Sequence, residues 1–231
     1  MIQGLLFDFF GTLVIYDERR VHQRFPRTHH QLADHGVKLD EKSLINVIDQ
    51  VFTRFELDAR DSMVEFSMAD IFTVVLNGLQ IDPQTVDLDQ LAHCYTQEWS
   101  VDIKPIKNVQ TFLRQLQREY QLGLITNTHF APMIKRLLKK FELESYFSTV
   151  VTSVEHGNSK PHPAIFQHTL EAMTLDVSQA VYIGDSYRAD YLGAQGVGMN
   201  CFLVGKHARV PDAYQIPTVV DLPRYQLSTM G

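Results

Sequence analysis

The sequence predicts an α/β fold, in which a doubly wound parallel sheet with helices on both faces carries an inserted cap of helices. Short apolar runs predict buried strands, helical patterns separate these runs, and one long region lacks them. The predicted strands are Gly4 to Phe7, Gln121 to Thr126, Ser148 to Thr152, Ala180 to Gly184 and Met199 to Val204. The helical patterns between them are Asn108 to Tyr120, Pro132 to Phe141, Pro163 to Met173 and Arg188 to Gly196.

The region from Asp17 to Ser100 breaks this alternation, because it has helical patterns but no comparable strand run. The patterns lie around Arg20 to His35, Glu41 to Ala59, Ser67 to Leu79 and Leu88 to Ser100. An insertion directly after the first strand lies over the carboxyl edge of the sheet, where doubly wound folds bind ligands. We therefore predict a Rossmann-like core of residues 1–15 and 101–231 and a helical cap of residues 16–100. After Gly205 only a weak strand signal remains, at Thr218 to Val220.

Charge and cysteine content narrow the range of functions. The net charge of −6 over 231 residues provides no positive field that would recruit nucleic acid or a membrane surface. No apolar run reaches the roughly 18 to 20 residues of a membrane span, and the apolar N-terminus, which Asp8 interrupts, is expected to be a strand rather than a leader. Cys94 and Cys201 are isolated, which favours a reducing compartment, the cytoplasm. We expect a small anionic substrate in a locally positive pocket; the oligomeric state is open.

Polar residues follow the first two predicted strands. Asp8 comes directly after an apolar run and is followed by Gly11, which can make a tight turn. The second strand ends in Thr126 and Asn127, whose hydroxyl and amide can donate hydrogen bonds to an anion. Because the carboxyl ends of parallel strands share one edge of the sheet, all these side chains are expected to face one crevice.

Charged residues follow later segments in the same way. Lys160 stands in a loop that two prolines stiffen, just ahead of a predicted helix. Asp185 comes directly after the strand Ala180 to Gly184, and Asp190 follows five residues later. Carboxylates this close disfavour joint ionisation, and a bound Mg²⁺ would relieve that cost.

Mg²⁺ prefers oxygen ligands, typically one or two carboxylates together with waters and substrate oxygens. Asp8, Asp185 and a backbone carbonyl, that of Phe10, are the candidate ligands. The pattern thus predicts a magnesium site at the sheet edge that also carries Lys160.

The segments at Asp8, Thr126, Lys160 and Asp185 form four motifs, which in this order resemble those of the haloacid-dehalogenase-like hydrolase superfamily. The insertion looks like the helical cap of that superfamily's first subgroup. The resemblance spans Asp8 to Asp190. It implies that Asp8 is a nucleophile that forms an acyl-linked covalent intermediate. It also implies that Thr126 and Lys160 hold the substrate anion and Asp8. On this basis we expect a Mg²⁺-dependent phosphatase of a small phosphorylated metabolite.

The resemblance assigns further roles. Asp185 would bind Mg²⁺, and Asp190 and Ser186 would support it. Asn127, Gly11 and Thr12 are expected to contact the substrate.

One position departs from the superfamily's phosphatases, which usually carry a second aspartate as general acid and base two residues after the nucleophile. Here that residue is Phe10, which cannot transfer a proton, and such help is typically worth about 10²–10⁴-fold in rate. The superfamily's haloacid dehalogenases have an aromatic residue there, because halide leaves without a proton. They lack a carboxylate at the position of Asp185, however, and have a tyrosine near the position of Phe166. A 2-haloacid dehalogenase therefore stays an alternative, as does a ligand-binding protein without turnover.

Other residues of the insertion and its surroundings are open to two interpretations. Arg20, Arg24 and Arg27 are candidate cap cations for a halide, although exposed helix charges are the simpler interpretation. The superfamily's phosphonate-cleaving members use a cap lysine and a small residue after the nucleophile that makes room for it, whereas Phe10 is bulky. His129 follows Asn127 closely and can approach the crevice, although a structural role is favoured. Trp99 is expected in the cap core.

Overall fold

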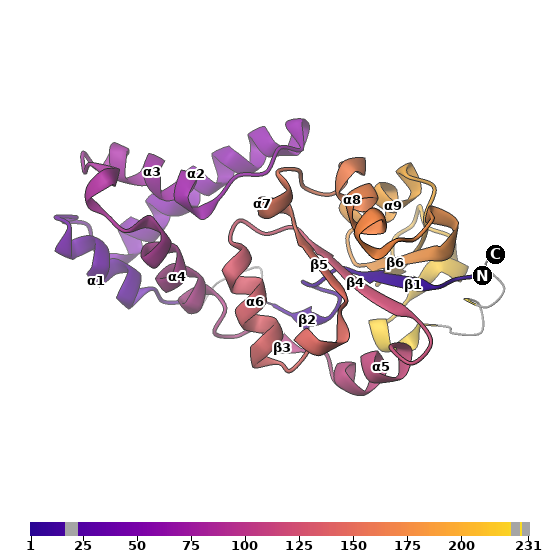
Figure 1. Ribbon diagram of the computed structural model, residues 1–231. Helices are drawn as coiled ribbons and strands as arrows, with labels where there is room; N and C mark the ends of the chain where they lie inside the picture. Colours follow the sequence, from indigo (N-terminus) through magenta and orange to yellow (C-terminus); the bar gives the residue numbers. More distant parts are fainter. Residues whose placement is uncertain (17–22, 223–226, 228–231) are drawn as a thin grey trace.

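The computed structural model describes residues 1–16, 23–222 and 227, and its main sheet is parallel throughout. Six strands lie in the order β5-β4-β1-β6-β7-β8 (Figure 1). They are β1 (Gly4–Phe7), β4 (Gln121–Thr126), β5 (Thr149–Thr152), β6 (Ala180–Gly184), β7 (Asn200–Val204) and β8 (Gln215–Ile216). The predicted parallel α/β fold is therefore confirmed, and each of the five predicted strands is present within one residue of its expected start.

Strand β1 is buried at the centre of the sheet. It pairs with β4 on one side and with β6 on the other. Leu5 and Phe7 pack into one hydrophobic cluster and Leu6 packs into a second, as the two-residue period of a strand requires. The strand ends at Asp8, whose N–H donates to the carbonyl of Ile183 at 2.9 Å. This bond fixes the start of the following loop at the carboxyl edge of the sheet.

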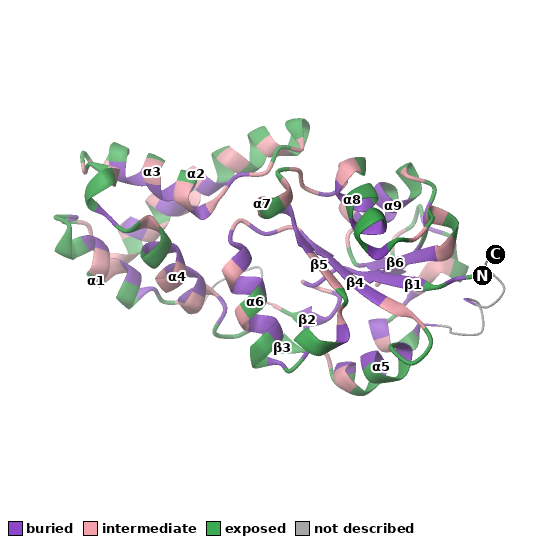
Figure 2. Cartoon of the chain, in the orientation of Figure 1, coloured by how far each residue is buried: buried purple, intermediate pink, exposed green. Residues whose placement is uncertain are grey.

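Helices cover both faces of the sheet, and Figure 2 shows the strands buried between them. Residues of α5 and α6 pack into the cluster of Leu5 and Phe7, and residues of α8 and α9 pack into the cluster of Leu6. The helices of this part of the chain are α5 (Val109–Leu116), α6 (Ala131–Lys140), α7 (Ser153–His156), α8 (Pro163–Met173) and α9 (Gly193–Gly196). The helix predicted from Arg188 begins differently, because Tyr187–Leu192 form a wide π-helical turn that leads into α9.

Four helices lie beyond the carboxyl ends of the strands (Figure 1). They are α1 (Pro26–Asp34), α2 (Glu41–Ser62), α3 (Met68–Gly78) and α4 (Leu88–Trp99). The side chains of Asp40, Ser67 and Asp87 each accept a hydrogen bond from a backbone N–H in the first turn of α2, α3 and α4. Such caps contribute about 1 kcal/mol each to helix stability. The part of the first predicted helix that contains Arg20 lies outside the described residues, and the boundaries of the predicted cap stay a prediction.

A second, antiparallel sheet joins the chain entering the cap region to the chain leaving it. Its strands are β2 (Val14–Ile15) and β3 (Lys104–Pro105). Two residues are too short a run to show a period of two, which explains why the sequence pattern did not indicate them. Within the described residues, no helix combines the length and apolarity that crossing a membrane requires.

The strand predicted at Thr218 to Val220 is wrong. Thr218 and Asp221 form a capping box around a short 3₁₀ helix, and the last strand within the described residues is β8, which lies earlier in the chain. Short polar side chains that bond to the nearby backbone compete with strand pairing in this way. The 3₁₀ helices are Pro83–Thr85, Glu144–Tyr146, Val177–Gln179, Asp212–Tyr214 and Val219–Asp221.

Helix α1 takes its N-terminal cap from another helix. Phe25 stands at the cap position without a side-chain hydrogen bond, and Glu98 of α4 supplies the acceptors instead. Its carboxylate accepts from the N–H groups of Arg27 at 2.8 Å and Thr28 at 3.0 Å, and from the Thr28 hydroxyl at 2.7 Å. Glu98 is buried, so this carboxylate ties α1 to α4 where solvent cannot replace it.

Substituting Glu98→Ala is expected to lower the free energy of unfolding by about 1–3 kcal/mol, because two N–H groups and a hydroxyl lose their acceptor. Chemical denaturation followed by circular dichroism measures the change. The matched control is the exposed Glu119→Ala, which should change stability by less than about 0.5 kcal/mol. Equal stability of the two variants would contradict the capping role.

Candidate active site

A buried lysine joins the loop after β1 to β6 and to the π-helical turn that follows β6. The Lys160 ammonium donates to Asp8 at 2.7 Å, to Asp190 at 2.6 Å and to the hydroxyl of Tyr182 at 2.7 Å. These bonds use all three N–H donors of the ammonium. The side chains of Lys160 and Asp190 are 2% and 1% exposed, so water screens the ion pair very little.

The main chain of Lys160 is fixed by a side chain at the end of β4. The amide oxygen of Asn127 accepts from the Lys160 N–H at 2.8 Å, and its amide nitrogen donates to the Lys160 carbonyl at 3.0 Å. Asn127 also lines the cavity described below. Asn127 thereby holds the lysine loop against β4. Its predicted contact with a substrate stays a prediction.

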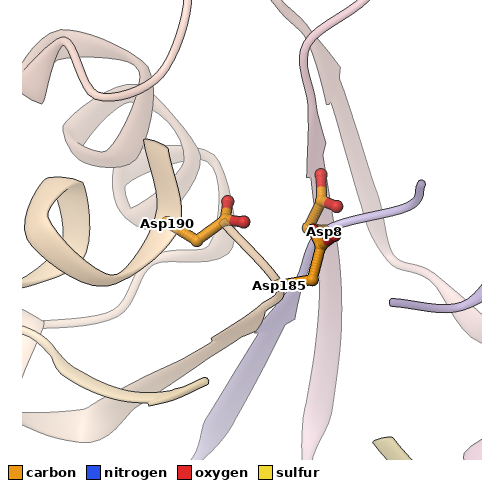
Figure 3. A group of neighbouring side chains, drawn as sticks. All are labelled: Asp8, Asp185 and Asp190. Carbon is orange, nitrogen blue, oxygen red and sulfur yellow. The ribbon is translucent and has the colours of Figure 1, made fainter. Parts of the chain in front are cut away.

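Three carboxylates, two of which bond to this lysine, lie near one another; Figure 3 shows the three aspartates. Asp8 follows β1, Asp185 follows β6 and Asp190 lies in the π-helical turn, and one oxygen from each lies within 4.8 Å of the others. The second oxygen of Asp190 accepts from the N–H of Ser186 at 2.8 Å. Asp190 is thus held by Lys160 and Ser186.

Two glycines leave room for these carboxylates. A methyl group placed on Gly11 would lie 2.0 Å from an oxygen of Asp185, and Gly11 has a φ of 76° that favours glycine. A methyl group on Gly184 would lie 2.4 Å from the carboxyl carbon of Asp190. Any side chain at either position would displace the neighbouring carboxylate.

The negative charge at the site is only partly balanced. Burial raises the pKa of Asp8 to about 7; the Lys160 ammonium opposes this shift, while Asp190 and Asp185 reinforce it. Burial opposes the positive charge of Lys160, yet the Asp190 and Asp8 carboxylates raise the pKa of Lys160 above its ordinary value. Lys160 therefore stays charged, whereas full ionisation of Asp8 needs more positive charge than one ammonium supplies.

The residues present fit a hard divalent cation. One ammonium faces three carboxylates, and oxygen atoms of two of them, Asp8 and Asp185, are the donor type that Mg²⁺ prefers. A divalent cation would offset the excess charge that raises the pKa of Asp8. The contribution of the Phe10 carbonyl stays a prediction.

The remaining predicted residues are distributed around this centre. Thr126 and Thr12 are fully buried, and neither they nor Gly11 are among the described residues that line the cavity. The Thr126 hydroxyl lies 3.5 Å from the carbonyl of Asn127. Ser186 lines the cavity and accepts a hydrogen bond from the N–H of Ala189. The roles assigned to these residues by resemblance stay predictions.

A cavity of about 560 Å³ opens from the carboxylates toward the cap helices. This volume is within the range of small-molecule sites. Much of its wall is apolar and comes from residues on both sides of the cap–core junction. The apolar wall residues are Phe10, Tyr16, Phe52, Met68, Tyr95, Trp99, Phe130 and Met133. Trp99, which was expected in the cap core, is therefore part of the cavity wall.

The segment between α2 and α3 is attached to the core through backbone hydrogen bonds. Met63 accepts from Ser159, Glu65 donates to Gly157, and Met68 donates to the carbonyl of His129, at 2.9–3.0 Å. Because Ser159 is next to Lys160, this attachment adjoins the lysine loop. The cap region is thus held over the sheet edge that carries the charged residues.

His129 lies at this attachment and lines the cavity. Its Nδ1 is 2.9 Å from a carboxylate oxygen of Glu65, and its ring stacks on Phe66 with centroids 4.0 Å apart. The prediction that His129 can approach the crevice agrees with this position. Its contacts with Glu65 and Phe66 also agree with a structural role for His129.

The candidate cap cations point to other partners. Arg24 pairs with Glu41 at 2.8 Å and Arg27 lies 3.6 Å from Glu98, and neither lines the cavity among the described residues. Arg20 lies outside the described residues.

The sequence did not identify Tyr182 as a residue of the site, nor which residues form the cavity wall. Tyr182 is fully buried in the middle of β6, and its hydroxyl contacts both Lys160 and Asp190. A tyrosine within an otherwise apolar buried strand is a signal that its hydroxyl has a partner. The partner itself comes from a distant part of the chain, which the local pattern does not identify.

Comparison with known proteins relates this geometry to one family. The family model described as haloacid dehalogenase-like hydrolase matches residues 2–198. Among solved structures, a 2-haloacid dehalogenase from Pseudomonas syringae pv. Tomato DC3000 aligns with a TM-score of 0.77 and 21% identity, over 99% of this chain and 100% of that one. A HAD phosphatase from Thermococcus onnurineus aligns with a TM-score of 0.59 and 20% identity, over 97% and 98%. At these identities the two structures show a shared fold.

A curated relative has a more similar sequence over a shorter span. A glyceraldehyde 3-phosphate phosphatase from Pyrococcus furiosus is 33% identical over 108 residues, which are 46% of this chain and 45% of the relative. The match thus spans less than half the length of that enzyme.

Substituting Gly11→Ala is expected to displace the Asp185 carboxylate and to abolish stabilisation of the protein by Mg²⁺, because the new methyl group occupies the carboxylate's position. Thermal unfolding with and without Mg²⁺ measures this. The matched control is Gly36→Ala, which has a φ of 95° but no atom within 4 Å of the added methyl group. Both variants carry backbone strain of roughly 1 kcal/mol, so a Mg²⁺ response that survives in Gly11→Ala would contradict the placement of Asp185.

The pKa of Asp8 predicts a pH dependence of stability in EDTA. Because the pKa is raised to about 7 on folding, from about 3.9 in the unfolded chain, the folded state binds the proton more tightly. The stabilising contribution is complete below about pH 4 and is lost as the pH rises to about 7. Wild type should therefore lose thermal stability relative to Asp8→Asn between about pH 5 and pH 8, and Asp34→Asn, at an exposed site, should follow wild type. Parallel pH curves for wild type and Asp8→Asn would show that Asp8 does not titrate in this range.

Proposed function

The chain belongs to the haloacid dehalogenase-like hydrolase family, and we propose that it is a Mg²⁺-dependent phosphatase of a small phosphorylated compound. The observation that carries this proposal is the arrangement of Lys160 between Asp8 and Asp190, with Asp185 next to Asp8. It brings a carboxylate nucleophile, a fixed cation and oxygen ligands to one end of a cavity. The similarity to a glyceraldehyde 3-phosphate phosphatase supports phosphoryl chemistry over less than half of that enzyme.

The first step transfers the phosphoryl group to Asp8. A carboxylate oxygen of Asp8 attacks phosphorus, the bond from phosphorus to the ester oxygen breaks, and the electron pair leaves with that oxygen. With Phe10 at the position of the usual acid, the departing oxygen takes its proton from water. The products of this step are an aspartyl phosphate, the alcohol and a hydroxide ion, which the proton released in the second step neutralises.

The second step returns the enzyme to its starting state. Water attacks phosphorus, the bond from phosphorus to the Asp8 oxygen breaks, and the carboxylate is regenerated together with inorganic phosphate. The proton of the water passes to the phosphate or the solvent.

The chain's own residues orient this chemistry. Lys160 fixes the Asp8 carboxylate and contributes positive charge beside the reacting phosphorus. Asp190 and Tyr182 hold the ammonium in place, and Asn127 holds its main chain. Such fixed charges cost no rearrangement when negative charge develops in the transition state.

Mg²⁺ held by Asp8 and Asp185 would offset the charge of the transferred group. The raised pKa of Asp8 indicates why a cation would help, because it would favour the ionised nucleophile at neutral pH. We place the protein in the cytoplasm, which agrees with two cysteines that form no disulfide.

Dehalogenation is the second candidate, and Phe10 is the observation that favours it. Two features weigh against it. The Asp185 carboxylate next to Asp8 would repel the carboxylate of a haloacid, and Arg24 and Arg27 are occupied by Glu41 and Glu98.

The substitution Asp8→Asn is expected to reduce Mg²⁺-dependent phosphate release at least about 10³-fold, because the amide cannot attack phosphorus. A panel of phosphate monoesters together with 2-chloropropionate, assayed with Mg²⁺ and with EDTA, measures this. Lys42→Ala, an exposed change in the cap region, serves as the control and should retain wild-type rates. Wild-type phosphate release by Asp8→Asn would remove the proposal, and chloride release that persists in EDTA would favour the dehalogenase.

A further inference from the structure

We propose that the preferred substrate is a phosphate monoester of a phenol, whose aromatic ring occupies the cavity between the core and the cap helices. This inference rests on the proposed phosphatase function and adds the class of leaving group. Three separate features of the cavity support it: an aromatic wall, no lysine or arginine among the described wall residues available for a second anionic group, and no acid at Phe10.

The wall nearest the nucleophile loop is a cluster of aromatic rings. Phe10 lies edge-on to Tyr16 at 5.5 Å and to Trp99 at 5.7 Å between ring centroids, and the Tyr16 and Trp99 rings are 6.3 Å apart. All three are partly exposed and line the same cavity as Asp8. They therefore present ring surface to a ligand, and aromatic rings pair with one another favourably beyond the area that they bury.

The described cavity wall has no cation free to bind a second anionic group of a substrate. Lys160 is its one lysine or arginine, and its three donors are used by Asp8, Asp190 and Tyr182. A protonated His129 would be balanced by Glu65 at 2.9 Å. Glu56 adds a further negative charge to the wall. Within the described wall, a carboxylate or a second phosphate next to the ester would therefore meet negative charge and no unoccupied lysine or arginine.

The third feature is chemical. A phenol such as that of tyrosine has a pKa of about 10, whereas the pKa of an aliphatic alcohol is far higher and close to that of water. Without the acid that Phe10 does not provide, a phenolate therefore departs much faster than an alkoxide. Phe10 stands in place of the usual acid and also contributes an aromatic ring to the wall. Both properties favour a phenolate as the leaving group.

Binding tests the wall independently of leaving-group chemistry. Phosphonates retain the charged end but have a carbon bound to phosphorus in place of the ester oxygen, so they serve as stable probes. With Mg²⁺ bound, phenylphosphonate should bind at least about tenfold more tightly than ethylphosphonate or 3-phosphonopropionate in calorimetric titrations.

Variants show whether the aromatic wall causes this preference. Trp99→Leu and Tyr16→Leu should each reduce it at least about threefold. Tyr214→Leu, which removes an aromatic ring that does not line the cavity in the described part of the chain, should leave it unchanged. Equal affinities for the phenyl and ethyl probes, or tighter binding of 3-phosphonopropionate, would overturn the inference.

Kinetics test the missing acid. Phenyl phosphate should be hydrolysed at least about 10²-fold faster than propyl phosphate. Phe10→Asp should supply the missing acid and so reduce the ratio of the phenyl phosphate rate to the propyl phosphate rate. The matched control is Phe10→Asn, which has no acidic proton, and Phe10→Asp should hydrolyse propyl phosphate at least about tenfold faster than this control. A selective loss of propyl phosphate hydrolysis in His129→Gln would identify His129 as the proton donor and overturn this part of the argument.

The outcomes also separate the two proposals. Faster Mg²⁺-dependent hydrolysis of propyl phosphate or glyceraldehyde 3-phosphate than of phenyl phosphate would reject the aryl preference and leave the phosphatase standing. Hydrolysis of none of these esters would reject both.

Discussion

The arrangement of the site depends on one buried cation. The Lys160 ammonium ties together the loop after β1, the strand β6 and the π-helical turn through Asp8, Tyr182 and Asp190. Removing a charged group from water costs several kcal/mol, and here three short hydrogen bonds to two carboxylates and a phenol offset that cost. The same bonds hold the carboxylates near one another, against their mutual repulsion.

The cavity has two chemically different ends, one with an excess of negative charge beside this cation and one with an aromatic wall. At one end the pKa of Asp8 is raised, so a cation would favour its ionised form, which suits a site that binds phosphate through a metal. At the other end Phe10, Tyr16 and Trp99 present ring surface. The backbone attachment of the α2–α3 segment to the lysine loop joins these two ends into one structure.

The sequence predicted those features that depend on local periodicity and on the shared edge of parallel strands. It placed Asp8, Asp185 and Lys160 together because each follows a strand or precedes a helix on that edge. It did not predict the partner of Tyr182, the cap that Glu98 provides for α1, or the aromatic wall, because each depends on the packing of distant segments. The π-helical turn also escaped prediction, because apolar spacing does not distinguish it from an α-helix.

The central claim is that Asp8 carries the phosphoryl group during turnover. It is tested most directly by acid quenching of the enzyme while it hydrolyses a radiolabelled phosphate monoester with Mg²⁺, followed by peptide mapping. The account predicts label on the peptide that contains Asp8, released by hydroxylamine as an acyl phosphate and missing from Asp8→Asn. Sustained turnover with no label on the protein at any quench time, and with Asp8→Asn still active, would contradict it.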